Sequence, residues 1–300
     1  MSPSSAVLAV PGDLATPTGG YGYDRRLLAE LRALGHDVAH LALGASFPAP
    51  TAADTADAAA RLAAVPAERP VLVDGLALGA LAPRALDGLL APLVALVHHP
   101  LALEPGLDAA QRDRLARTER ANLARAARVL VTSPHTAARL AADFGVDAGR
   151  ITVARPGVDR PATPAAPVDP PLVLAVGIQV PRKGHDVLLR ALGRITDRRW
   201  QAVIAGPALD ATHAANLAAL ARSPALAGRV RLAGHVPAAE LTRLYGRATV
   251  FALATRYEGH GMVLDEAMAR GLPVVSCATG AVPDRLAAGA GLLVPPDDPE

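Results

Sequence analysis

The chain has 300 residues, of which 51% are hydrophobic and 3% aromatic, and its formal net charge is +2. This length favours two domains, and the small net charge excludes the strong positive field with which many proteins attract nucleic acid or acidic lipid. The single cysteine, Cys277, excludes an intrachain disulfide. The first residues lack the basic segment of a signal peptide, and the apolar run at 6–10 is too short to cross a membrane, so we expect a cytoplasmic protein.

The first half of the chain alternates short apolar runs with amphipathic stretches. Such runs, bounded by turn residues, are typical of buried strands in a parallel sheet, and the stretches between them are typical of crossover helices. The expected strands are 6–10, 37–43, 71–74, 92–97, 128–133 and 151–154. The expected helices are 24–34, 51–64, 83–90, 108–127 and 134–144. Residues 1–160 are therefore predicted to form one doubly wound α/β domain.

A loop over residues 11–23 is predicted between the first strand and the first helix, and it contains Gly19 and Gly20. A glycine pair in this place suits close approach of backbone N–H groups to a phosphate. The segment does not spell G-x-G-x-x-G, and no acidic residue ends the second strand, which argues against a dinucleotide-binding dehydrogenase. The alternative is a flexible loop that needs glycine only for its turn.

Two histidines, His98 and His99, follow the predicted strand 92–97 directly. The carboxyl end of a buried parallel strand is where ligands bind in α/β sheets, so both are candidate site residues. The alternative for each is a structural hydrogen-bonding role. No cysteine or third histidine stands at ligand spacing, so no metal site is expected.

The predicted helix 108–127 is rich in arginine, and its basic face is a candidate for contact with a membrane surface or an acidic acceptor. Acidic residues are interspersed and large apolar residues are scarce, which favours an ordinary solvated face instead. The arginines on or beside this helix are Arg112, Arg114, Arg117, Arg120, Arg125 and Arg128.

Residues 161–171 are rich in proline and alanine without periodicity, which predicts a semi-rigid interdomain linker. The alternation then resumes, so residues 172–300 are predicted to form a second domain of the same type. The expected strands are 172–177, 200–205, 230–233, 248–254 and 273–276. The expected helices are one that ends at residue 192, then 210–221, 238–245, 262–270 and one that ends at residue 288. A crevice between two such domains is a natural place for a ligand.

A basic pair, Arg182 and Lys183, stands just before a predicted helix in the second domain. The free N–H groups and dipole of a helix N-terminus already favour an anion, and two added cations would hold a diphosphate. An Arg-Lys pair on its own is more commonly exposed to solvent, but the strand–loop–helix setting favours the anion site.

Two carboxylates, Glu258 and Glu266, flank the start of the predicted helix 262–270, with Gly259 and Gly261 in the loop before it. Taken singly, each glutamate is more commonly a partner of the helix dipole or a solvated side chain. Together with the free N–H groups of the helix start, the two carboxylates would point into one crevice at the end of the preceding strand. The combination indicates a binding site.

These features together resemble the retaining family 4 glycosyltransferases, which have the GT-B fold. The matching segments, in chain order, are Gly19-Gly20, Gly177…Pro181-Arg182-Lys183-Gly184, Gly234-His235-Val236, Glu258…Glu266 with Gly271-Leu272-Pro273, and, more weakly, Gly291-Leu292-Leu293-Val294. The resemblance covers essentially the whole chain. It implies an α/β fold of two Rossmann-like doubly wound domains that face a central cleft.

The resemblance also implies roles for individual residues. Arg182 and Lys183 would bind the diphosphate of the donor, with the Gly20 N–H approaching from the other domain. Glu266 would hold the ribose hydroxyls, and Glu258 would contact the donor sugar. Backbone at Val236 would contact the nucleobase of the donor. Further donor contacts are implied for Gly19, Gly177 and the loop Gly259, His260, Gly261 and Met262.

His98 or His99 matches the histidine that the family carries near the transferred sugar and the acceptor. His98 is slightly favoured because it lies nearer the strand end, and the choice between the two stays open. His260 stands where the family often has an aromatic residue, which implies an effect on sugar choice.

The implied reaction moves a hexose from a UDP- or GDP-sugar to an unidentified small-molecule, lipid or glycan acceptor, with retention at the anomeric carbon and without a metal or other cofactor. Bond breaking places negative charge on the diphosphate, where cations and a helix N-terminus stabilise it. One alternative is a non-catalytic or truncated sugar-nucleotide-binding protein, since family members usually continue beyond the point where this chain stops. Another is a GT-B sugar-nucleotide epimerase. No G-x-x-x-x-G-K-[ST] occurs, which argues against a P-loop enzyme.

Overall fold

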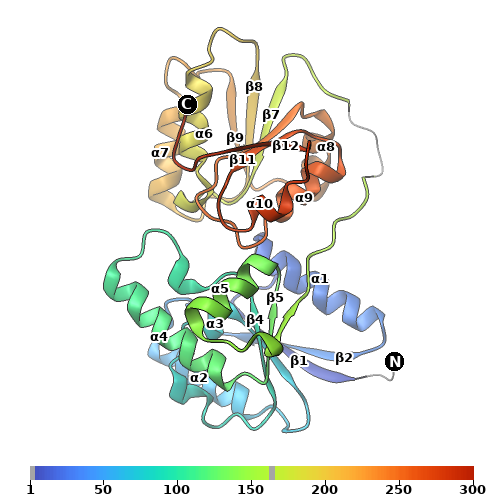
Figure 1. The fold of residues 1–300 in the computed structure, drawn as a ribbon, viewed down its shortest axis with the longest axis vertical. Helices are drawn as coiled ribbons and strands as arrows, with labels where there is room; N and C mark the ends of the chain where they lie inside the picture. The colour runs from blue at the N-terminus through green and yellow to red at the C-terminus, as the bar shows by residue number, and fades with distance from the viewer. Residues whose placement is uncertain (1–3, 162–165) are drawn as a thin grey trace. The chain divides into compact units, whose positions relative to one another are not determined.

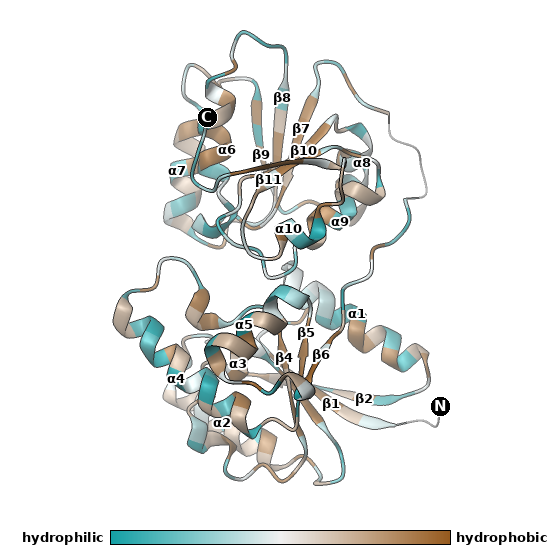
Figure 2. Cartoon of the chain, viewed as in Figure 1, coloured by the Kyte–Doolittle hydropathy of each residue, from teal (hydrophilic) through white to brown (hydrophobic). Residues whose placement is uncertain are grey.

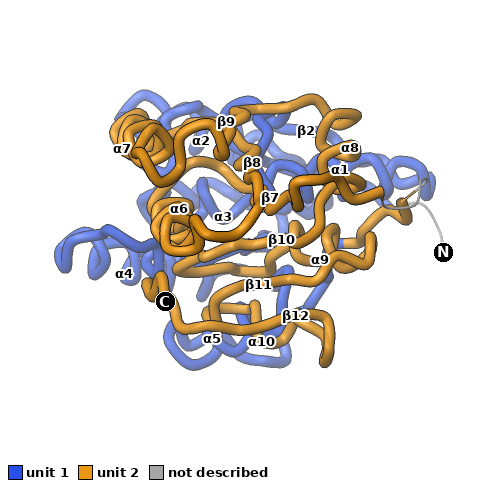
Figure 3. Tube along the Cα trace, turned by 90° about the horizontal axis from the view of Figure 1, so that it is seen from above, with its two compact units in different colours: residues 1–156 blue, residues 157–300 orange. Residues whose placement is uncertain are grey.

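The structure is a computed structural model that describes residues 4–161 and 166–300. The chain divides into two compact units, residues 1–156 and 157–300 (Figure 3). Each unit holds a six-stranded sheet whose paired strands all run parallel, with helices between successive strands (Figure 1). The predicted doubly wound α/β organisation is confirmed in each. Four residues of the predicted linker, 162–165, lie outside the described residues.

The first unit has the strand order β2-β1-β3-β4-β5-β6. Its strands are β1 (Ser5–Pro11), β2 (Asp37–Leu43), β3 (Val71–Asp74), β4 (Leu93–Val97), β5 (Arg128–Val131) and β6 (Ile151–Val153). Its α-helices are α1 (Gly19–Ala33), α2 (Ala52–Ala63), α3 (Gly75–Leu78), α4 (Ala109–Arg125) and α5 (Pro134–Phe144), and its 3-10 turns are Pro83–Leu86, Leu101–Leu103 and Ala148–Arg150. The order reverses between β1 and β3, and ligands of doubly wound sheets bind at the carboxyl ends of the strands at such a point.

The second unit has the strand order β12-β11-β10-β7-β8-β9, so its reversal lies between β7 and β10. Its strands are β7 (Leu172–Val176), β8 (Gln201–Ala205), β9 (Val230–Gly234), β10 (Val250–Leu253), β11 (Val274–Cys277) and β12 (Gly291–Val294). Its helices are the 3-10 turn Pro181–Lys183, α6 (His185–Gly193), α7 (Ala211–Ala221), α8 (Ala238–Arg247), α9 (Met262–Ala269) and α10 (Val282–Arg285). Among the described helices, none is long and apolar enough to cross a membrane.

Side chains of the central strand β7 point alternately into two apolar cores, one on each face of the sheet. Leu172 and Leu174 pack in the core that also holds Phe251, whereas Ala175 packs in the core that holds Ile204. Successive strand residues face opposite sides, so a strand covered on both faces is apolar throughout. In Figure 2 the central strands are mostly brown, whereas the helices carry both brown and teal residues. The continuous apolar runs in the sequence have this physical origin.

The start of the first helix differs from the prediction. α1 begins at Gly19 rather than Asp24, because the side chain of Thr18 caps it and accepts a hydrogen bond from the Tyr21 N–H at 3.3 Å. The end of the predicted loop 11–23 is therefore the first turn of a helix. Serine and threonine are common N-caps, so Thr18 carried a signal for this boundary.

Three shorter segments also differ from the prediction. The predicted helix 83–90 is only a 3-10 turn, Pro83–Leu86. The helix α3 was not predicted; its cap is Asp74, whose carboxylate accepts a hydrogen bond from the Leu76 N–H at 2.9 Å. The helix predicted to reach residue 288 ends at Arg285. Short turns of this kind have no hydrophobic period long enough to recognise.

Gly184, which joins the 3-10 turn Pro181–Lys183 to α6, has no room for a side chain. Its φ is +61°, and a Cβ atom there would lie 1.8 Å from the carbonyl oxygen of Ala254. We expect Gly184→Ala to lower the free energy of unfolding by about 2–4 kcal/mol, measured by urea denaturation. Gly246 in α8 has open space around it, so Gly246→Ala is the control and should raise stability by about 0.5–1 kcal/mol. Equal effects of the two changes would contradict this account of the turn.

Candidate functional site

In the second unit, the reversal between β7 and β10 brings two predicted site residues together. Lys183 follows β7, Glu258 follows β10, and the lysine Nζ lies 2.6 Å from Glu258 Oε1. Their side chains are only 13% and 7% exposed. Because β7 and β10 pair directly, their carboxyl ends place residues 75 positions apart in contact. The predicted cation and the predicted carboxylate thus form one buried ion pair.

Glu258 is held in its charged form by its neighbours. The hydroxyl of Thr255 lies 3.2 Å from Oε1, and Arg182 donates a hydrogen bond to the nearby Tyr257 carbonyl at 3.2 Å. Burial alone would raise the pKa of Glu258, but the charges of Lys183 and Arg182 and the hydrogen bonds outweigh it and hold the pKa below its ordinary value. Arg182, Lys183 and Glu258 therefore form one charged cluster.

The second predicted carboxylate, Glu266, lies on α9 and has a partner that the sequence did not reveal. Tyr245 on α8 donates a hydrogen bond from its hydroxyl to Glu266 Oε2 at 2.8 Å. The tyrosine ring stacks on Phe251, with centroids 5.9 Å apart, and the guanidinium of Arg270 lies 4.6 Å from the ring centroid. Burial raises the pKa of Glu266, with the Tyr245 hydrogen bond opposing it. Tyr245 fixes the direction of one carboxylate oxygen.

The loop before α9 is largely enclosed. Gly259, His260 and Gly261 are buried, and Met262 is partly buried. The His260 ring turns to Asp265, with Nε2 2.9 Å from Oδ2, and Arg285 donates to the other oxygen of Asp265 at 2.5 Å. Asp265 and Arg285 were not predicted as site residues, and nothing in their spacing marks them.

Two other residues that were predicted to bind the sugar donor, Gly177 and Val236, also lie in the second unit. Gly177 follows β7, and its carbonyl oxygen accepts a hydrogen bond at 3.2 Å from Nε2 of His185, the first residue of α6. Burial lowers the pKa of His185 to about 4, so this imidazole is neutral. Val236, which follows β9, is partly buried and packs against the core that holds Phe251.

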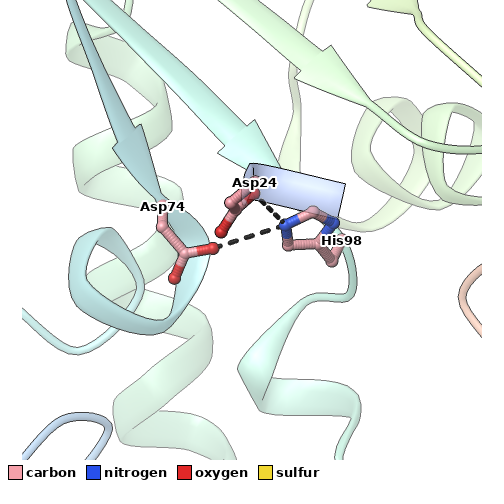
Figure 4. Close-up of side chains that lie close together, drawn as sticks. All are labelled: Asp24, Asp74 and His98. Atoms are coloured by element: carbon pink, nitrogen blue, oxygen red, sulfur yellow. Dashed lines mark hydrogen bonds and ion pairs between the residues drawn. The ribbon is translucent and has the colours of Figure 1, made fainter. Parts of the chain in front are cut away.

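In the first unit, His98 lies against two buried carboxylates at the carboxyl ends of the neighbouring strands β3 and β4 (Figure 4). Its Nε2 is 2.9 Å from Asp24 Oδ1 and 3.5 Å from Asp74 Oδ2. Asp24 comes from α1, Asp74 from the end of β3, and His98 from the end of β4. In the sequence the two aspartates stand only at the start of a predicted helix and at the end of a predicted strand.

Gly20 also packs against His98. A Cβ atom at Gly20 would lie 3.3 Å from His98 Cδ2, a distance that few side chains tolerate. The ring of Tyr23 meets the imidazole edge-on, with centroids 5.3 Å apart. Glycine at position 20 therefore lets the helix approach the histidine ring closely.

His99 turns to a different partner, since its Nε2 lies 3.1 Å from Glu104 Oε2. The buried carboxylate of Glu119, on α4, fixes the segment that follows both histidines. It accepts hydrogen bonds from the N–H groups of Leu101 and Ala102 at 2.7 and 2.9 Å. Of the two histidines, His98 is the one that lies against two buried carboxylates.

Asp24, Asp74 and His98 are also residue types that occur in metal sites, and one ligand atom of each lies within 4.8 Å of the others. The 2.9 Å contact between His98 and Asp24 is a hydrogen-bond distance, so hydrogen bonding already accounts for that pair.

Two family models match the chain, one for each half. Residues 19–160 match the model described as Glycosyltransferase Family 4, and residues 170–300 match the model described as Glycosyl transferases group 1. Only residues 1–18 and 161–169 lie outside the two matches.

Known proteins with similar sequences or structures include the following three. The D-inositol 3-phosphate glycosyltransferase of Thermobifida fusca is 33% identical over an alignment of 233 residues, which covers 69% of this chain and 54% of that protein. Sucrose-phosphate synthase from Thermosynechococcus elongatus has a TM-score of 0.80 at 22% identity, over 98% of this chain and 87% of the other. Anabaena HepE, solved with UDP and glucose, has a TM-score of 0.76 at 18% identity, with the same coverage. The chain spans about half the length of the curated relatives it matches.

The structure predicts strong coupling between Lys183 and Glu258. Removing either partner leaves the other charge buried and unpaired, so Lys183→Ala should lower the free energy of unfolding by about 3 kcal/mol. A double-mutant cycle with Glu258→Ala should give a coupling energy of about 1–3 kcal/mol at pH 7. The pKa of Glu258 is lowered, so this stabilisation is present above the ordinary pKa and is lost as pH falls through the folded value.

The control for this cycle is the surface pair Arg26 and Glu30, whose side chains are 61% and 57% exposed. Solvent screens such a pair, so its coupling energy should be much smaller. Equal coupling in the two cycles would show that burial does not strengthen the pair at the β7/β10 reversal.

Proposed function

We propose that this chain, which belongs to the family 4 glycosyltransferases, transfers a hexose from a nucleotide diphosphate sugar to an acceptor and retains the configuration at the anomeric carbon. The observation that carries the proposal is the buried pair of Lys183 and Glu258 at the reversal between β7 and β10. A buried cation beside the N-terminal ends of α6 and α9 provides a place for a diphosphate. The proposal includes a cytoplasmic location and no metal or other cofactor.

The proposed chemistry depends on where charge develops. As the bond between sugar and diphosphate breaks, negative charge grows on the leaving group and positive charge on the anomeric carbon. Lys183 and Arg182 would stabilise the diphosphate, and the Glu258 carboxylate, released from the lysine, would turn to the sugar. In the absence of donor the carboxylate neutralises the lysine, so the charged residues are held in place before the substrate arrives.

Glu266 is proposed to accept hydrogen bonds from the ribose hydroxyls through its oxygens. Tyr245 already donates a hydrogen bond to Oε2, so the ribose contact is assigned to Oε1. Backbone at Val236 would lie at the base, and the amides from Gly259 to Met262 would bind sugar or phosphate oxygens. Contacts with the nucleotide sugar are also proposed for Gly19, Gly20 and Gly177.

The comparisons suggest which donor and acceptor to test first. HepE, which shares this fold, was solved with UDP and glucose, so a UDP-hexose is the first donor and a GDP-hexose the second. The curated relatives are named for D-inositol 3-phosphate, so an inositol phosphate is the first acceptor. His98 is proposed to lie near the transferred sugar and the acceptor.

Donor binding should stabilise the protein by mass action. At 100 times its Kd, a donor adds about 2.7 kcal/mol, which corresponds to about 5–10 °C in melting temperature. The measurement is a thermal-shift series with UDP-, GDP- and ADP-sugars, and free sugars and NAD serve as negative controls. Stabilisation by one nucleotide class supports the proposal, whereas a folded sample that no nucleotide sugar stabilises contradicts it.

A second experiment assigns the ribose contact. Glu266→Gln keeps the size of the side chain but removes its charge, and we expect the donor Kd to rise about tenfold, since one charge-assisted hydrogen bond is weakened. Isothermal titration calorimetry measures the change. Glu240→Gln on α8, where the glutamate pairs with Arg243 at the surface, is the matched control and should leave the Kd unchanged. An unchanged Kd in Glu266→Gln would remove this residue from the donor site.

A further inference from the structure

His98 is placed against two carboxylates that have no access to water. Asp24 is 0% exposed and Asp74 is 1% exposed, whereas the side chain of His98 is 21% exposed. Both carboxylates lie on the same side of the ring, next to Nε2, and the other ring nitrogen, Nδ1, points away from them (Figure 4). The imidazole therefore has one nitrogen directed into the protein and one directed away from the acids.

The cluster of Asp24, Asp74 and His98 has more hydrogen-bond acceptors than donors when both carboxyl groups are ionised and the imidazole is neutral. Asp24 Oδ1 receives the hydrogen on Nε2, but Asp24 Oδ2 is buried and has no hydrogen-bond partner among the described residues. In Figure 4 that oxygen lies on the side toward Asp74. Two buried carboxylates so close together repel each other, and a positive charge on the ring or a proton on one acid relieves the repulsion.

We infer that Asp24 and Asp74 are positioning residues that keep His98 as an imidazolium, so that its Nδ1–H donates a hydrogen bond outward to an oxygen atom. The ligand class is then a hydroxyl or phosphoryl oxygen of the sugar substrate or the acceptor, which rests on the proposed function. The protonation itself does not depend on that function. At neutral pH His98 acts as a hydrogen-bond donor and not as a base.

The pKa shifts agree with this geometry. Burial alone would lower the pKa of His98, but the hydrogen bond to Asp24 and the charges of Asp24 and Asp74 raise it above its ordinary value. Burial, opposed by His98 and reinforced by Asp24, raises the pKa of Asp74 to about 7.

Other titratable groups near the ring do not supply this charge. On α1, burial raises the pKa of Tyr21 to about 12 and also raises the pKa of Tyr23, so both stay neutral. His99, next in sequence, faces Glu104 instead. Among the described residues, Asp24 and Asp74 are therefore the acids that face the imidazole.

The test is an NMR titration of the full chain with isotope-labelled histidine and no donor present. The His98 signals are assigned by their loss in His98→Gln. We expect both ring nitrogens to carry hydrogens at pH 7, and the pKa of His98 to lie above the ordinary value of about 6.5. A neutral ring at pH 7 in the unaltered protein would overturn the inference without any further variant.

Two variants show whether the aspartates are responsible. Asp24→Asn and Asp74→Asn should each lower the pKa of His98, the first by about one unit or more, which is a tenfold fall in the ratio of protonated to neutral ring at a given pH. Glu104→Gln is the matched control and should alter the titration of His99 but not that of His98. A His98 pKa that is the same in folded Asp24→Asn would contradict a positioning role. If Asp24→Asn does not fold, Asp74→Asn answers the same question.

The same sample distinguishes a proton from a metal ion. Sub-millimolar Mn²⁺ should leave the His98 signals unchanged, and selective broadening of those signals would show that a cation takes the place of the proton. Turnover separates this inference from the proposed function. A protonated His98 in a protein that neither binds nor uses a nucleotide sugar would refute the function and leave the charge state intact.

Discussion

The carboxyl edge of a parallel sheet is the constraint on which the candidate site residues depend. Every strand of each unit ends at the same edge, so the segment after each strand enters the same neighbourhood. In the second unit this edge brings Lys183 to Glu258, and in the first it brings His98 to Asp74. In both pairs a basic side chain that follows one strand meets a carboxylate from the neighbouring strand. In the second unit the two strands, β7 and β10, lie on either side of the reversal, whereas in the first unit they are the adjacent strands β4 and β3.

The sequence predicted much of this because the strands are covered on both faces. Continuous apolar runs located the strands. Lys183, Glu258 and His98 became candidates because they lie in the segments after those strands and because their neighbours match a recognised pattern. The pairing of Lys183 with Glu258 could not be predicted in that way. It depends on β10 lying beside β7, and strand order is a property of the whole sheet that no local pattern encodes.

The residues that were missed reach the site from elements outside that pattern. Asp24 belongs to a helix, and its contact with His98 depends on α1 starting at Gly19, which Thr18 sets. Tyr245 lies on α8 and looks in the sequence like an ordinary core aromatic. Its hydroxyl contributes only because α8 and α9 pack so that it reaches Glu266. Partners of this kind follow from packing, and a single sequence does not specify packing between helices.

The first turn of α1 constrains which amino-acid substitutions this protein can accept during evolution. Gly20 and Asp24 are four residues apart and thus lie on one face of the helix, so the same face gives His98 both its space and its acidic partner. A side chain larger than glycine at position 20 would push the ring away from the carboxylate as well as crowd it. The two positions are therefore linked through the imidazole, and in related sequences we expect a change at one to be accompanied by a change at the other.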